Sequence, residues 1–71
     1  MNLTLVPISG KAKIKEINHP FLRTKLLEMG VTLGNEVTIT MRAPFGGPIA
    51  FRCGNSIISI RLEDAHHIMV N

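Results

Sequence analysis

The chain has 71 residues, of which 45% are hydrophobic and 18% are charged. This size predicts one small domain over residues 1–71, too small to enclose a substrate cleft between two lobes. Eight Lys and Arg residues against five Asp and Glu residues give a net charge of +3, which permits an acidic partner without requiring one. The single cysteine excludes an internal disulfide and a zinc site built from a cysteine cluster.

Three features of the sequence bear on the compartment. No apolar run approaches the roughly 18 residues that a membrane helix requires. Residues 1–7 lack the charged leader and the long apolar stretch of a signal peptide. A small domain without disulfides is typical of a reducing compartment, which is what we expect here.

The first predicted strand covers residues 11–17, after a short lead-in over residues 1–9. Ala12 and Ile14 alternate with lysines, so one face is apolar and the other is solvated. Ile17 breaks the alternation, so we expect the strand to bend or end there. The lysines either face an acidic partner or protect an exposed edge from aggregation; they are Lys11, Lys13 and Lys15.

The predicted helix covers residues 20–29. Pro20 suits its first turn and Asn18 suits its N-cap. Gly30 and Val31 are typical of a Schellman motif, which ends a helix with a left-handed glycine. Because an isolated helix this short is marginal, its apolar stripe must dock on the rest of the domain. That stripe consists of Leu22, Leu26 and Met29.

Four further strands and one helical turn follow. The clearest strand alternates Val37, Ile39 and Met41 on the inner face with polar residues on the outer face. A Gly54-Asn55 turn joins the next two strands into a hairpin. The predicted strands cover residues 36–42, 49–53, 56–61 and 68–70, and the helical turn covers residues 62–66.

Together these elements predict a mainly β fold. It is a small, partly open barrel of about five antiparallel strands, with one short α-helix between strands 1 and 2. Closure into a barrel protects strand edges that a small open sheet would expose. The predicted core contains apolar residues that share one phase within each element: Ile14, Leu22, Leu26, Val37, Ile39, Ile49, Phe51, Ile58, Ile60 and Ile68.

No catalytic constellation stands out, so we expect a protein that is not an enzyme. Gly46 and Gly47 lie between two prolines in a strand connection, which favours a tight turn over a phosphate-binding loop. Glu63 and Asp64 are adjacent carboxylates at a helix start rather than an acid and base pair. Cys53, at an inward strand position, is interpreted as a small buried hydrophobic residue.

The weak candidates for metal ligands are His66 and His67, with Asp64 beside them. Adjacent histidines point in divergent directions, so they rarely share one ion without a third ligand. We therefore expect two exposed histidines and no tightly bound cofactor. His19, just before the helix, is expected to make a surface or capping contact.

Candidate partner-binding residues lie on the helix and in the loop over residues 42–48. Phe21 and Phe45 are large apolar side chains without an obvious place in the core. Aromatic and arginine side chains commonly anchor protein interfaces. The alternative is that Phe21 packs under the loop against Phe45 as a minor core. The predicted partner surface comprises Phe21, Arg23, Lys25, Arg42, Pro44, Phe45, Gly46 and Gly47.

Three stretches of the sequence, in this order and spacing, resemble ferrous iron transport protein A, the FeoA family. They are Leu26-Leu27-Glu28-Met29-Gly30-Val31 with Leu33-Gly34, then Arg42-Ala43-Pro44-Phe45-Gly46-Gly47-Pro48-Ile49, and finally Ile60-Arg61-Leu62-Glu63-Asp64-Ala65 with Ile68-Met69-Val70. The resemblance covers roughly residues 3–70. One departure is Gly47, because the family often carries an acidic residue before the second proline of this loop.

The resemblance implies an SH3-like barrel in the bacterial cytoplasm. It also implies an accessory role to FeoB, the membrane ferrous iron transporter with an N-terminal GTPase domain, so that the chain reaches the membrane only through this partner. SH3-like barrels host many functions, so the fold alone does not establish this role.

Three functions follow as hypotheses. The first is a non-enzymatic adaptor that binds the cytoplasmic region of FeoB and modulates the transporter. The second is a metal-sensing module that binds Fe(II) weakly through His66 or His67 with nearby carboxylates. The third is a small nucleic-acid-binding barrel, which is disfavoured because the chain has no Trp or Tyr for base stacking.

Overall fold

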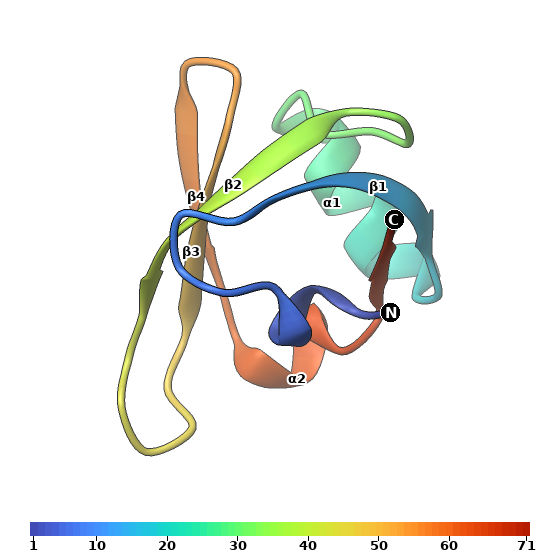
Figure 1. Cartoon of the computed structure of the whole chain (residues 1–71). Helices are drawn as coiled ribbons and strands as arrows, with labels where there is room; N and C mark the ends of the chain where they lie inside the picture. Colours follow the sequence, from blue (N-terminus) through green and yellow to red (C-terminus); the bar gives the residue numbers. More distant parts are fainter.

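The computed structural model describes residues 1–71 and confirms the mainly β fold. Its five antiparallel strands lie in the order β4-β3-β2-β1-β5 (Figure 1). The strands are β1 (Lys11–Ile17), β2 (Glu36–Arg42), β3 (Ile49–Cys53), β4 (Ser56–Ile60) and β5 (Ile68–Val70). The helices are η1 (Leu3–Leu5, a 3-10 turn), α1 (Pro20–Glu28) and α2 (Leu62–Ala65). No helix combines the length and apolar character that crossing a membrane requires.

The sheet curls because β1 bends and changes its pairing partner. Its first half pairs with β2 and its second half pairs with β5. A bulge between Ile14 and Glu16 separates the two halves, and a bulge of this kind bends a strand. The same bulge brings Ile17 to the buried face, which accounts for the break in the sequence alternation.

The N-terminal cap of α1 differs from the sequence prediction. Nδ1 of His19 accepts a hydrogen bond from the backbone N–H of Leu22 at 3.1 Å. The N-cap is therefore His19, the residue directly before the helix, and not Asn18, which precedes it by one residue. The capping contact expected of His19 is confirmed.

The C-terminal end of α1 is the predicted Schellman motif. Gly30 has a φ of +84°, and the Val31 N–H donates to the Leu26 carbonyl at 2.8 Å. The helix ends at Glu28, one residue earlier than expected. Met29 is consequently the C-cap and stays partly exposed, so its placement in the buried stripe was wrong.

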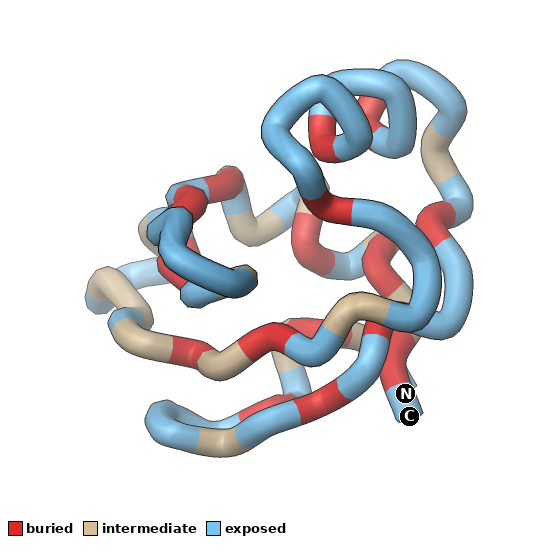
Figure 2. The backbone as a smooth tube through the Cα atoms, turned by 90° about the horizontal axis from the view of Figure 1, so that it is seen from above, coloured by how far each residue is buried: buried red, intermediate tan, exposed pale blue.

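The core lies inside the curled sheet, with α1 packed over it. Figure 2 shows buried and exposed residues alternating along the strands, as the sequence period requires. The helix contributes Leu22 and Leu26, which join the strand residues in one cluster. Every predicted core residue is buried: Ile14, Leu22, Leu26, Val37, Ile39, Ile49, Phe51, Ile58, Ile60 and Ile68.

One strand face was predicted incorrectly. Met41 is 43% exposed, although its strand pattern predicts an inward side chain. Ala50 is buried, although it alternates in the sequence with the inward residues Ile49 and Phe51. For Met41 the cause is a shift in the β2–β3 register between Ile39 and Met41, because one extra residue in β2 reverses the direction of the side chains after it. Ala50 lies in β3 and is buried together with both of its neighbours, so its burial is not a change of phase. Cys53 is half-buried and packs against the core, as expected for a small hydrophobic residue.

The N-terminal segment, predicted to be a short lead-in before the first strand, belongs to the core. Leu3 and Val6 are buried in the main cluster. Asn2 forms an isolated antiparallel bridge with Met69, and the Val70 N–H donates to the Met1 carbonyl at 2.7 Å. These contacts bring the two chain ends together beside β5 (Figure 1).

Candidate functional site

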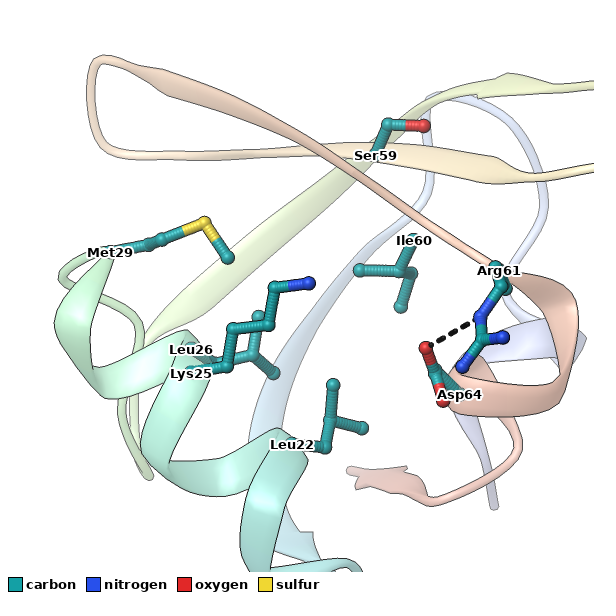
Figure 3. A pocket seen from close by; sticks show the side chains of 8 residues that line it. All are labelled: Leu22, Lys25, Leu26, Met29, Ser59, Ile60, Arg61 and Asp64. Carbon is teal, nitrogen blue, oxygen red and sulfur yellow. Dashed lines mark hydrogen bonds and ion pairs between the residues drawn. The ribbon is translucent and has the colours of Figure 1, made fainter.

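A hollow of about 220 Å³ lies between α1 and the end of β4 (Figure 3). One wall comes from α1 and the other from β4 and the first turn of α2. In Figure 3, Ile60 points from β4 into this hollow, toward Leu22 and Leu26 of the helix. Its lining residues are Leu22, Lys25, Leu26 and Met29 on the helix, and Ser59, Ile60, Arg61 and Asp64 on the opposite side.

The hollow continues along α1 toward the start of the helix. A second depression, of about 150 Å³, shares four lining residues with the first and extends to His19 and Phe21. Phe21 is 84% exposed, so its ring forms part of an accessible rim. We call the two depressions together the α1–β4 groove. It has an apolar floor and an exposed aromatic side chain at one end.

The walls of the groove carry more positive than negative charge. Lys25 projects from the helix across the floor, and Arg61 stands on the other side (Figure 3). Nε of Arg61 lies 3.3 Å from Oδ2 of Asp64, which neutralises part of its charge. Lys25 has no acidic partner, so the lining as a whole favours a negatively charged group.

The structure divides the predicted partner surface. Phe21 and Lys25 lie in the α1–β4 groove, but Arg23, on the same helix, lines a smaller depression of about 50 Å³ with Ile17 and Leu27. The loop over residues 42–48 projects from the far end of β2 and β3, away from α1 (Figure 1).

The alternative of a minor core between the two aromatics is wrong. Phe45 is fully exposed at 104%, and Phe21 is exposed as well, so neither ring covers the other. Phe21 instead contacts His19, with 6.2 Å between the ring centroids. The two phenylalanines are therefore separate surface features that can be tested independently.

Turn geometry explains the glycines of the loop. Phe45 and Gly46 both have positive φ values, +59° and +74°, and the Gly47 N–H donates to the Pro44 carbonyl at 3.1 Å. This is the pattern of a type I′ turn. A Cβ at Gly47 would lie 2.7 Å from the Ala43 Cβ, so a side chain there, acidic or not, has no room in this backbone.

Arg42 has an internal role in the structure. Its Nη2 donates to the backbone carbonyl of Thr4 at 2.6 Å and also to that of Val6. Both acceptors lie in the N-terminal segment, and the side chain is half-buried. The guanidinium group thus ties η1 and the residue after it to the end of β2 instead of facing solvent.

The weak metal candidates do not converge. Asp64 pairs with Arg61, Nδ1 of His66 lies 2.9 Å from the Leu62 carbonyl, and His67 packs its ring edge against His19 with 5.3 Å between centroids. The structure brings no three His, Cys, Asp or Glu side chains into an arrangement that could hold a metal ion.

Sequence reasoning missed the β4 side of the groove. Ser59 and Ile60 are more than 30 residues from the helix in the chain. No local sequence pattern predicts that β4 and α1 lie close enough to line one groove. Met29 was predicted to belong to the stripe of α1 that docks on the domain, but it is partly exposed and lines the groove. The signal available in the sequence was the absence of charge in Ser56–Ile60, a strand that the fold places at the sheet edge.

The curled five-stranded antiparallel sheet with one helix defines an SH3-like domain. A FeoA domain model matches residues 1–71, so the chain belongs to the FeoA family, which is associated with ferrous iron transport. The search of curated proteins finds no match.

Three solved structures illustrate the similarity. FeoA from Chlorobium tepidum is 25% identical, with a TM-score of 0.91 over 99% of this chain and 68% of that one. Iron(II) transport protein A from Clostridium thermocellum is 35% identical, with a TM-score of 0.88, and the match covers 99% of this chain but only 44% of that one. A zinc complex of Stenotrophomonas maltophilia FeoA, described as an SH3 domain protein, is 24% identical with a TM-score of 0.84 over 100% of this chain and 89% of that one, and supports the fold.

Proposed function

We propose that this chain is a non-enzymatic cytoplasmic accessory protein of bacterial ferrous iron uptake, which binds the GTPase region of a FeoB-type transporter and modulates it. The observation that carries the proposal is the FeoA match over residues 1–71. The FeoA family is associated with ferrous iron transport. In that process, we propose that the transporter is the protein on which this accessory chain acts.

The surface supports a role in protein contact. The α1–β4 groove combines an apolar floor with an exposed aromatic rim at Phe21 and an unpaired positive charge at Lys25. Apolar anchors surrounded by polar groups are typical of the centre of a protein interface. Of the predicted partner residues, Phe21 and Lys25 are therefore the ones we propose to contact the transporter. The loop glycines and Arg42 stabilise the domain.

Co-purification tests this function directly. The tagged chain is mixed with the full-length transporter in detergent, with and without a non-hydrolysable GTP analogue, and the rate of GTP hydrolysis is measured in parallel. We expect a complex in at least one nucleotide state and a changed hydrolysis rate when the chain is added. Absence of a complex in both states would overturn the proposal.

A further inference from the structure

β4 leaves backbone hydrogen-bonding groups unused at the edge of the sheet. It pairs with β3 on one side and with no strand on the other. The two-residue turn at Gly54-Asn55 closes on the pair Cys53 and Ser56, and hydrogen-bonded pairs then recur at every second residue. The intervening residues, Ile57 and Ser59, therefore direct their N–H and C=O groups outward.

Nothing in the chain occupies those groups. Neither Ile57 nor Ser59 takes part in any of the backbone hydrogen bonds outside the strands and helices, and both residues are exposed. β4 also lacks the devices that usually protect an edge strand, because it has no charged residue, proline or bulge. It is a regular, uncharged template for one more strand.

The free edge lies beside the α1–β4 groove. Ser59 and Ile60 line the groove, and Ile60 points into it. Side chains of a strand alternate between its two faces, so a strand added to β4 would direct every second side chain toward the groove. A volume of about 220 Å³ with Leu22, Leu26 and Met29 around it accommodates an apolar side chain.

The charges around the groove indicate which kind of polypeptide segment would bind beside β4. Lys25 and Arg61 border the groove, and Asp64 offsets only one of them. An acidic side chain next to the apolar anchor would therefore be attracted. A second copy of this chain is a poor occupant through its own β4, because that strand has no acidic residue to place beside Lys25 and Arg61.

We infer that the free edge of β4 binds an extended acidic segment of the partner as an additional strand, with one apolar side chain of that segment inserted in the α1–β4 groove. Pairing through the backbone provides affinity, and the groove provides the choice of side chain. This inference rests on the proposed function in that the transporter is the expected source of the segment.

The first test compares two charge reversals on the same helix. Lys25→Glu changes the groove, whereas Arg23→Glu makes the same change of charge on the other flank of α1. Affinity for the full-length transporter is measured by biolayer interferometry in lipid nanodiscs. We expect Lys25→Glu to weaken binding by about tenfold or more, and Arg23→Glu to stay within about twofold of the wild type.

The second test changes the backbone of the edge. Ser59→Pro removes the outward N–H and obstructs an added strand, a substitution that edge strands tolerate, whereas Ser59→Ala retains the N–H. We expect Ser59→Pro to lose binding and Ser59→Ala to keep it. Thermal melting of both variants verifies that the domain is folded.

The possible results separate the inference from the proposed function. If the wild type binds and both Lys25→Glu and Ser59→Pro bind as tightly, the groove is not the site and the inference is overturned, while the proposed function stands. If the wild type does not bind at all, the proposed function itself fails. A dimer of the free chain in sedimentation equilibrium, abolished by Ser59→Pro, would identify a second copy as the occupant and overturn the acidic segment.

Discussion

The two edges of the sheet are treated very differently. At β5, the N-terminal segment covers the strand through the Asn2–Met69 bridge and the bond from the Val70 N–H to the Met1 carbonyl. Arg42 holds that segment in place from the other side. At β4, no part of the chain covers the outward groups of Ile57 and Ser59.

The chain therefore covers the edge at β5 with its own N-terminal segment and leaves the edge at β4 uncovered. An open edge is a liability, since it pairs readily with other chains. Leaving β4 open beside an apolar, positively charged groove is consistent with an edge reserved for a partner. The covered edge, in contrast, contributes to stability, because Leu3 and Val6 enter the core as the segment covers β5.

The largest loss of stability is expected from a substitution in the core that supports both edges of the sheet. Leu26, on the inner face of α1, is fully buried in the cluster to which strands at both ends of the sheet contribute. Leu26→Ala should lower the free energy of unfolding by about 2–5 kcal/mol, because it removes packed methyl groups and leaves a cavity. Urea unfolding followed by circular dichroism measures this. The adjacent Leu27, which is exposed, is the control: Leu27→Ala should change stability by less than about 0.5 kcal/mol.

The next effect is specific to the covered edge. Arg42→Met removes the charged hydrogen bonds to the Thr4 and Val6 carbonyls, and should cost about 1.5–3 kcal/mol. Hydrogen exchange at the Val70 amide should accelerate as the N-terminal segment loosens. Arg52→Met removes an exposed arginine with no such bonds and serves as the control. Equal stability of the two variants would contradict a stabilising role for the hydrogen bonds from Arg42 to the N-terminal segment.

A smaller effect is expected at the helix that borders the open edge. His19→Ala removes the acceptor that caps α1 and should cost about 0.5–2 kcal/mol. Asn18→Ala is the matched control, because the Asn18 side chain does not cap the helix. Thermal unfolding distinguishes the two, and a greater loss in Asn18→Ala would restore the N-cap predicted from the sequence.

The smallest effect on stability separates the two exposed aromatics. Phe21→Ala and Phe45→Ala should each change the free energy of unfolding by less than about 0.5 kcal/mol, because both rings are exposed. Only Phe21→Ala, at the rim of the α1–β4 groove, should weaken binding to the transporter. Weaker binding in Phe45→Ala alone would move the interface to the loop at the other end of the molecule.

Sequence periodicity predicted the elements and the core because burial repeats with the period of each element. It failed where a bulge changes the phase, as at Met41, and where a segment has no period, as at Leu3 and Val6. The residue types identified two phenylalanines as interface candidates, but they could not show that α1, which contains Phe21, lies apart from the β2–β3 loop, which contains Phe45 (Figure 1). The groove itself depends on a tertiary contact between α1 and β4, which no local pattern encodes.

If the partner segment pairs with β4, binding protects the backbone of β4 and leaves that of β5 unchanged. Hydrogen–deuterium exchange of the whole chain, with and without the full-length transporter in nanodiscs, tests it most directly. We expect slower exchange in β4, at the outward amides of Ile57 and Ser59, and unchanged exchange in β5. Protection of the loop over residues 42–48 or of β5, with β4 unaffected, would contradict it.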